Sequence, residues 1–137
     1  VIVVGTDQEK YDAFAAARAA LACSGTIALE LALARLPAVI AYRISAVTAF
    51  LYRRLIKIRF ANLVNIMHDR LVVPELIQEN CTAEQLAAAC DQLLADPAAR
   101  AAQIAGLTQT AQWLGEGDTP PSARAAQTVL KVAGLTS

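Results

Sequence analysis

The stretch Cys23-Ser24-Gly25-Thr26-Ile27-Ala28-Leu29-Glu30 decides the fold of this 137-residue chain. It joins an apolar run, residues 19–22, that is typical of a buried strand to an apolar helix expected over residues 26–34. Its glycine lets a ligand approach the backbone, and its serine and threonine supply hydroxyls. The first N–H groups of the helix carry partial positive charge. This order of strand, small-residue turn and helix predicts a phosphate-binding turn.

Glu30 is the only charged residue in the expected helix, and it lies four positions after Thr26 on the same face. A carboxylate on an otherwise apolar helix needs a partner, and the hydroxyls of a ribose would be one. The ordinary alternative is that Ser24 or Thr26 caps a core helix while Glu30 points to solvent. For a single Ser-Gly-Thr both interpretations stay open.

The composition excludes several classes of function. Lys plus Arg and Asp plus Glu number 12 each, so the formal net charge is zero and nucleic acid is not expected as the main partner. No apolar run reaches the roughly 18 to 20 residues that a transmembrane helix needs. The chain starts in an apolar run at Val1, without an initiator methionine, which predicts one domain cut from a longer protein. Its cysteines are expected to be free thiols in a reducing cytoplasm: Cys23, Cys81 and Cys90.

The first part of the chain alternates strands and helices. Residues 1–4 are expected as a buried strand, 6–10 as a loop and 11–18 as a short helix. After Pro37, residues 38–42 form another all-apolar strand. Such alternation implies a parallel sheet with helices on both faces, so the expected fold class is α/β, a Rossmann-like domain of three layers.

Residues 44–60 are expected to form a helix, capped by Ser45, with an apolar face beside basic side chains. This arrangement is typical of a helix that lies on a membrane surface. The alternative is an ordinary surface helix whose basic residues are solvated. The residues that would contact the membrane are Phe50, Leu51, Arg53, Arg54, Lys57 and Arg59.

The middle of the chain is expected to hold a short strand over residues 61–64 and a loop over 65–70. His68, in that loop, is expected to be exposed, since no carboxylate or cysteine is arranged around it in sequence; neither a metal site nor a nucleophile is predicted. Residues 72–78 are expected as an apolar strand that ends in a helical turn. Pro74 would occupy the first position of this turn, and Glu75 and Gln78 would share a face on which they could line a pocket.

The last part of the chain is expected to be helical. Thr82 and Gln85 form a capping box for a helix that runs to about residue 95, and Asp96-Pro97 starts another before Gly115. A final amphipathic helix is expected over 122–133. The chain has neither the G-x-x-x-x-G-K-[ST] motif for a nucleoside triphosphate nor G-x-G-x-x-G for a dinucleotide. A helix N-terminus with one ribose-binding acid better suits a nucleoside diphosphate.

Several separated motifs, in the same order, resemble the lipid-A-disaccharide synthases. The similarity runs from about Val1 to the helix after Thr82 and fades beyond Trp113. The motifs are Ser24-Gly25-Thr26 with Leu29-Glu30, Val39-Ile40-Ala41-Tyr42-Arg43, Thr48, Arg53-Arg54-Leu55, Asn65, Arg70, and Val72-Val73-Pro74-Glu75-Leu76-Ile77-Gln78. This chain differs from the usual family pattern of proline before the asparagine and Gly-Arg-Glu in the following loop, since it has Val64 and Asp69-Arg70-Leu71.

The resemblance implies one half of a two-domain GT-B glycosyltransferase, with residues 1–137 as its C-terminal UDP-sugar-binding domain and 120–137 as a helix at the domain edge. The implied reaction transfers diacylglucosamine from UDP-2,3-diacylglucosamine to 2,3-diacylglucosamine 1-phosphate with inversion, and it needs no metal or other cofactor. The general base is expected in the N-terminal half, so no residue of this chain is named as catalytic. The implied partners are the donor, the lipid acceptor, the N-terminal domain and the anionic inner leaflet, to which a cytoplasmic enzyme would bind peripherally.

Carried over residue by residue, the resemblance implies that Ser24, Gly25 and Thr26 hold the pyrophosphate and Glu30 the ribose. Tyr42 and Arg43 would face the cleft between the halves, where open α/β sheets bind ligands. The other residues implied to line the donor site are Asn65, Arg70, Glu75 and Gln78.

Two alternatives remain. One is another UDP-sugar enzyme of the same architecture, such as an N-acetylglucosaminyltransferase of the muramyl pathway or a UDP-N-acetylglucosamine 2-epimerase; donor preference would separate these, because only the lipid A enzyme needs an acylated sugar. The other is a UDP-binding module without catalysis.

Overall fold

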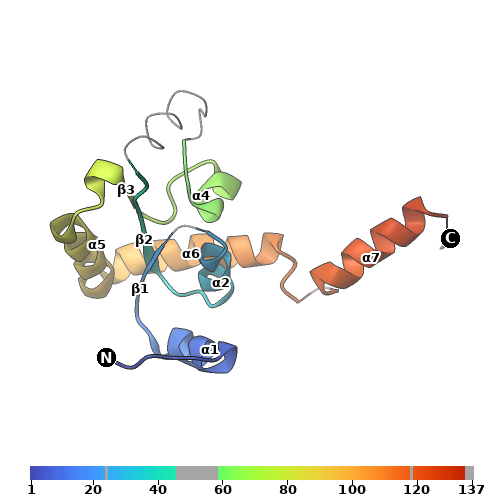
Figure 1. Ribbon diagram of the computed structural model, residues 1–137, viewed down its shortest axis with the longest axis horizontal. Helices are drawn as coiled ribbons and strands as arrows, with labels where there is room; N and C mark the ends of the chain where they lie inside the picture. The colour runs from blue at the N-terminus through green and yellow to red at the C-terminus, as the bar shows by residue number, and fades with distance from the viewer. Residues whose placement is uncertain (24, 46–58, 118, 135–137) are drawn as a thin grey trace.

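The computed structural model describes residues 1–23, 25–45, 59–117 and 119–134 (Figure 1). Ser24 and nearly all of the helix expected over residues 44–60 lie outside the described residues. The predicted membrane contacts Phe50, Leu51, Arg53, Arg54 and Lys57 lie outside them as well.

A three-stranded parallel sheet lies at the centre of the molecule, in the order β1-β2-β3. The strands are β1 (Ala20–Cys23), β2 (Ala38–Tyr42) and β3 (Glu75–Ile77). Ala20 is paired with Ala38, and Ile40 with Glu75. The central strand begins with three residues that are at most 1% exposed, in agreement with its all-apolar sequence. Because the strands are parallel, their carboxyl ends lie at one edge of the sheet.

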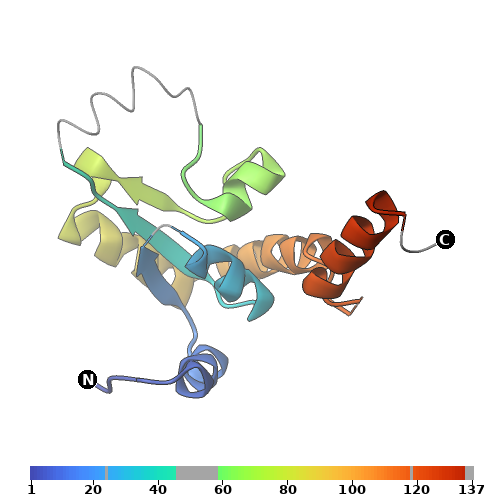
Figure 2. The same ribbon diagram turned by 45° about the vertical axis from the view of Figure 1, so that its right-hand side comes forward.

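Helices connect and follow the strands, which confirms the predicted α/β, Rossmann-like class. They are α1 (Asp7–Ala16), α2 (Ile27–Leu33), α4 (Leu63–His68), the 3₁₀ turn η1 (Gln78–Asn80), α5 (Ala83–Ala95), α6 (Pro97–Trp113) and α7 (Pro121–Val132). Thr82 and Asp96 cap α5 and α6 as expected: Thr82 Oγ1 accepts from Gln85 N at 3.3 Å, and Asp96 Oδ1 from Ala98 N at 2.8 Å. Figures 1 and 2 show α7 extending away from the sheet.

The hydrophobic core lies where α2, β2, α4 and α6 meet. Small side chains on α2 allow close packing, and one large residue from each neighbour fills the space between them. The buried residues of this core are Ala28, Leu31, Ala32, Leu36, Ala38, Ile40, Val64, Val73 and Leu107. The core therefore fixes α2, which follows the predicted phosphate-binding turn, against the sheet.

The predicted strand over residues 1–4 is wrong in this structure. These residues have no regular secondary structure, and the side chains of Val1, Ile2 and Val3 are almost fully exposed. A β-branched run becomes a strand only when a neighbour satisfies its backbone, and no described strand pairs with it.

The first helix begins at Asp7, not at residue 11, so the loop predicted over residues 6–10 is wrong. Thr6 and Glu9 form a capping box: Glu9 N donates to Thr6 Oγ1 at 3.2 Å, and Thr6 N donates to Glu9 Oε2 at 3.0 Å. The N–H of Gly5 and the hydroxyl and N–H of Thr6 lower the pKa of Glu9. The Thr-x-x-Glu pattern at residues 6–9 is the signal that predicts this helix start.

The strand predicted over residues 61–64 is wrong, because α4 begins at Leu63. Asn62 Oδ1 accepts from Val64 N at 2.8 Å, which is the arrangement of an N-cap. His68 is therefore the last residue of a helix and not an exposed loop residue. Its Nε2 lies 2.9 Å from Thr110 Oγ1, and its ring centroid 4.5 Å from that of Trp113. Burial and the nearby Arg70 lower the pKa of His68.

The helical turn predicted after residue 73 is displaced. Glu75 belongs to β3, and the carbonyl of Pro74 accepts from Ile40 N at 2.9 Å, so the proline precedes a strand and not a helix. Its missing N–H is tolerated at the first position of a strand. The turn comes later, at η1, where Gln78 has the left-handed φ of 53°.

Candidate functional site

The carboxyl edge of the sheet brings together residues from three separate parts of the chain. The turn containing Gly25 and Thr26 follows β1, Tyr42 and Arg43 lie at the end of β2, and Gln78 directly follows β3. Tyr42 is 38% exposed, and Arg43 is also exposed. This is the edge at which open α/β sheets bind ligands.

Gly25 has open space around it at this edge. Its φ is +136°, a conformation that other residues rarely adopt, and a Cβ added there would meet no described atom within 4 Å. A ligand can therefore approach the backbone of the turn closely. Thr26 occupies the N-cap position of α2 but makes no capping hydrogen bond with its side chain. The side-chain hydroxyl of Thr26 therefore does not cap α2, and the alternative of a simple helix cap is wrong for this residue.

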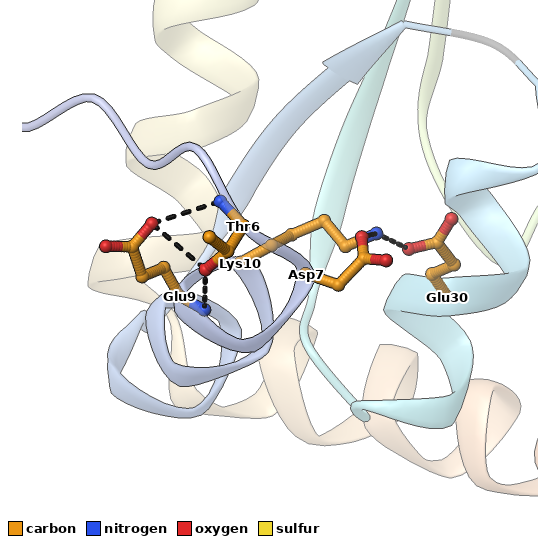
Figure 3. A network of polar contacts seen from close by, with 5 residues as sticks. All are labelled: Thr6, Asp7, Glu9, Lys10 and Glu30. Atoms are coloured by element: carbon orange, nitrogen blue, oxygen red, sulfur yellow. Dashed lines mark hydrogen bonds and ion pairs between the residues drawn. The ribbon is translucent and has the colours of Figure 1, made fainter.

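Glu30 is not directed simply to solvent, because Lys10 from α1 reaches it. Lys10 Nζ lies 2.8 Å from Glu30 Oε2 and 3.0 Å from Asp7 Oδ1 (Figure 3). The carboxylate of Glu30 has the largest effect on the pKa of Lys10 and raises it, and Asp7 raises it further, so the amine is charged at neutral pH. In Figure 3 the second oxygen of Glu30 points away from Lys10. The carboxylate thus has one oxygen held by Lys10, and its other oxygen makes no hydrogen bond to the described residues.

The sequence alone does not indicate that Lys10 belongs to the site. With residues 6–10 expected as a loop, the lysine has no defined direction. The capping box at Thr6 sets the start of α1 and with it the face on which Lys10 lies. Recognising that cap would have placed Lys10 on a helix but would not have identified Glu30 as its partner, because their contact is tertiary.

Asn65 is fully buried, and protein groups fill all four hydrogen-bonding positions of its amide. Its Nδ2 donates to Val73 O and Glu75 Oε1, both at 2.7 Å. Its Oδ1 accepts from Val72 N at 2.8 Å and from Val73 N at 2.9 Å. An amide has two donors and two acceptor positions, so this side chain has none left for a ligand. In this arrangement Asn65 fastens α4 to the segment that leads into β3.

Glu75 and Gln78 also bind the backbone of neighbouring segments. Glu75 Oε2 accepts from Ala61 N at 2.8 Å, and its Oε1 accepts from Asn62 N at 2.9 Å. Gln78 Oε1 accepts from Ile44 N at 2.9 Å, and its Nε2 donates to Ile44 O at 3.3 Å. Glu75 thus holds the segment just before α4, and Gln78 holds the segment just after β2.

Arg70 is exposed and is not brought to the carboxyl edge. It lines a shallow pocket of about 210 Å³ together with Leu93 and Gln103. Gln103 Oε1 accepts from Ala38 N, at the amino end of β2. Arg70 is thus placed nearer the opposite end of the strands from Tyr42.

Of the residues that differ from the usual family pattern, Asp69 has a structural explanation. Asp69 has a φ of 46° at the C-cap of α4, a left-handed conformation that suits the usual glycine and that aspartate tolerates. Val64 is fully buried in the core, whereas Leu71 is 61% exposed.

Arg59, the one described member of the predicted membrane contacts, is exposed, and its Nη1 lies 3.6 Å from Asp69 Oδ1.

Comparison with known proteins assigns the chain to one family. The model of the lipid-A-disaccharide synthetase family matches residues 1–129. The lipid-A-disaccharide synthase of Rhodospirillum centenum is 64% identical over 126 residues, which cover 92% of this chain and 31% of that protein. The enzymes of the same name from Paramagnetospirillum magneticum and Bradyrhizobium diazoefficiens are 54% and 43% identical, over 89% and 94% of this chain and 32% and 33% of their own lengths.

The chain therefore spans about a third of the length of these relatives. The motifs quoted from the sequence lie within the matched region, and the parallel sheet with its open turn at Gly25 agrees with the expected Rossmann-like domain. The chain belongs to the lipid-A-disaccharide synthetase family.

Proposed function

We propose that this chain forms the UDP-sugar-binding half of a GT-B glycosyltransferase of lipid A biosynthesis. The reaction transfers diacylglucosamine from UDP-2,3-diacylglucosamine to 2,3-diacylglucosamine 1-phosphate and releases UDP. The observation that carries the proposal is the open turn at Gly25, which lies at the carboxyl edge of a parallel sheet in a chain that belongs to this family. That edge is the usual ligand site of such sheets.

The edge residues have distinct roles in this proposal. The backbone at Gly25 and the hydroxyls of Ser24 and Thr26 hold the diphosphate, and Glu30 binds the ribose with the oxygen that Lys10 does not occupy. Tyr42 and Arg43 are exposed at the end of β2 and face the sugar or the other domain.

Asn65, Glu75 and Gln78 act indirectly, since their polar atoms bind the protein's own backbone. They keep α4 and the segments beside the site in place. Arg70 would reach the donor only if its side chain moved from the pocket that it lines.

The chemistry proposed for this half is stabilisation of the leaving diphosphate. Backbone N–H groups and cations directed at the phosphates offset the negative charge that develops as the glycosidic bond breaks. The general base that deprotonates the acceptor hydroxyl belongs, in this proposal, to the N-terminal half. Binding and positioning by this chain alone do not replace that base.

The purified chain should bind UDP weakly and form no disaccharide. Calorimetric titration with UDP tests the first part, and incubation with UDP-2,3-diacylglucosamine and its acceptor, followed by mass spectrometry, tests the second. Measurable disaccharide would mean that the base is in this chain. A folded chain that binds no UDP would contradict the donor-site role.

A matched pair of glycine variants sharpens the titration. Gly25→Val places a β-branched side chain where φ is +136° and where the ligand should approach, so it should abolish UDP binding. Gly117→Val is the control, because Gly117 also has a positive φ of +83° and open space around it but lies far along the chain, after α6. UDP binding should survive in that control.

We also infer that the enzyme associates peripherally with the anionic inner leaflet of the membrane. No helix within residues 1–23, 25–45, 59–117 and 119–134 is long and apolar enough to cross a bilayer. The proposed contact is the basic stretch that contains Arg53, Arg54, Lys57 and Arg59.

Replacing these four cations by glutamate should release the chain from anionic vesicles, since each cation near such a surface is worth roughly 1 kcal/mol. Co-sedimentation with phosphatidylglycerol vesicles at low and high salt measures the effect, and neutral vesicles serve as the control. Equal pelleting of the wild type and the glutamate variant would rule out this contact.

A further inference from the structure

A second pocket lies at the amino end of the sheet, opposite the candidate donor edge. Its volume is about 310 Å³, and it is lined in part by Arg18, which precedes β1, and by Arg35 and Pro37, which precede β2. Arg100 and Ile104 of α6 and Phe14 of α1 also line it. The two sites lie at opposite ends of the same strands, so a ligand in this pocket is not the group that reacts at the donor edge.

The arginines of this pocket carry more positive charge than nearby carboxylates neutralise. Arg35 is paired with Glu116, whereas Arg100 Nη1 donates to carbonyls in the last turn of α5, those of Leu93 at 3.0 Å and Leu94 at 3.3 Å, which carry only partial negative charge. Arg18 makes no hydrogen bond or ion pair within the described part of the chain. The described lining residues include no aspartate or glutamate.

The remainder of the pocket wall is apolar, with Phe14, Pro37 and Ile104 among its lining residues. An arginine presents a planar fork of N–H donors that matches phosphate oxygens, and two arginines without a carboxylate partner favour an anion. The volume is at the lower end of the usual range for ligand pockets. A free polar metabolite would leave the apolar wall unused, and an uncharged lipid would leave the arginines unused.

We propose that this pocket binds a phosphate group with an attached aliphatic part, the phosphate between Arg18 and Arg100 and the aliphatic part against Phe14 and Ile104. Such a group is found in a small alkyl phosphate and in the headgroup region of an anionic phospholipid. Arg35 lines the same pocket, but Glu116 neutralises its charge.

The test is titration of the full chain with octyl phosphate and with inorganic phosphate, followed by heteronuclear NMR. Octyl phosphate should shift the amide signals of residues 14–18 and 34–37 and should bind more tightly than inorganic phosphate. Arg18→Gln should weaken octyl phosphate binding by about tenfold or more without unfolding the chain, because Arg18 has no described partner to lose. Lys131→Gln, which removes the same charge from α7, should bind octyl phosphate like the wild type.

Vesicles distinguish the two sources of the ligand. If binding to phosphatidic acid vesicles falls with Arg18→Gln but not with Lys131→Gln, the pocket takes membrane headgroups. If only soluble octyl phosphate depends on Arg18, its ligand is a soluble phosphate ester. Equal affinity of the wild type and Arg18→Gln for both ligands, or signal shifts confined to residues 25–27 at the donor edge, would overturn the proposal.

Discussion

Replacing Asn65 by alanine should lower the free energy of unfolding by roughly 3 kcal/mol, because a buried amide with four protein partners would be lost at once. The backbone N–H groups of Val72 and Val73 would remain buried without an acceptor. Glu75 Oε1 would lose one of its two hydrogen-bond donors and keep the other, Asn62 N. Urea unfolding followed by circular dichroism measures the change.

Two further variants show whether the amide itself is responsible. Asn65→Asp keeps the acceptor for Val72 and Val73 but replaces the donor with a negative oxygen that faces Glu75, so it should destabilise the chain at least as much as Asn65→Ala at neutral pH. Asn80→Ala, at an exposed position in η1, should change stability by less than about 0.5 kcal/mol. A loss below about 1 kcal/mol for Asn65→Ala would show that the network does not hold α4 in place.

The sequence predicted the central part of the fold because its signals there are local and strong. The all-apolar run before Tyr42 is a buried central strand, and the caps at Thr82 and Asp96 start helices where expected. These features depend on residues within a few positions of one another. The apolar α2 after Gly25 likewise required no knowledge of tertiary contacts.

The sequence predictions are wrong where one pattern is compatible with two kinds of secondary structure, or where the structure depends on a residue that is distant in the chain. Val1–Val4 has the composition of a strand, but composition does not provide a neighbouring strand, and these residues are exposed. Residues 61–64 are apolar enough for a strand, yet Asn62 caps a helix whose position also depends on Glu75. That second contact joins residues 13 apart in the chain, so no local rule predicts it.

The same distinction applies to the candidate site. The phosphate-binding turn could be predicted from Gly25 and its neighbours, since the turn is continuous in sequence. The contacts of Asn65, Glu75 and Gln78 could not, because a family motif identifies the residues without distinguishing those that touch a ligand from those that hold the backbone. The hydrogen bonds of these side chains to the protein's own backbone make that distinction, most completely for Asn65.

Replacing Glu30 by alanine should weaken UDP binding by roughly 10- to 100-fold, since a hydrogen bond to a charged group is typically worth about 1.5 to 3 kcal/mol. Weaker binding alone does not identify the contact, because the variant also removes the partner of Lys10. The informative measurement is calorimetric titration of UDP and 2′,3′-dideoxy-UDP into the wild type and Glu30→Ala. If Glu30 binds the ribose, the carboxylate and the sugar hydroxyls share one coupling energy, and the variant loses most of the wild type's preference for UDP.

Lys10→Met provides the matched control, because it breaks the same ion pair but keeps the carboxylate. A ribose contact predicts that this variant retains the preference for UDP over the dideoxy ligand, even if freeing the Glu30 side chain lowers both affinities. A purely structural role of the ion pair predicts instead that Glu30→Ala and Lys10→Met weaken both ligands alike. If Glu30→Ala discriminates between the ligands as strongly as the wild type does, Glu30 does not bind the ribose, and its function is to attach α1 to α2 through Lys10.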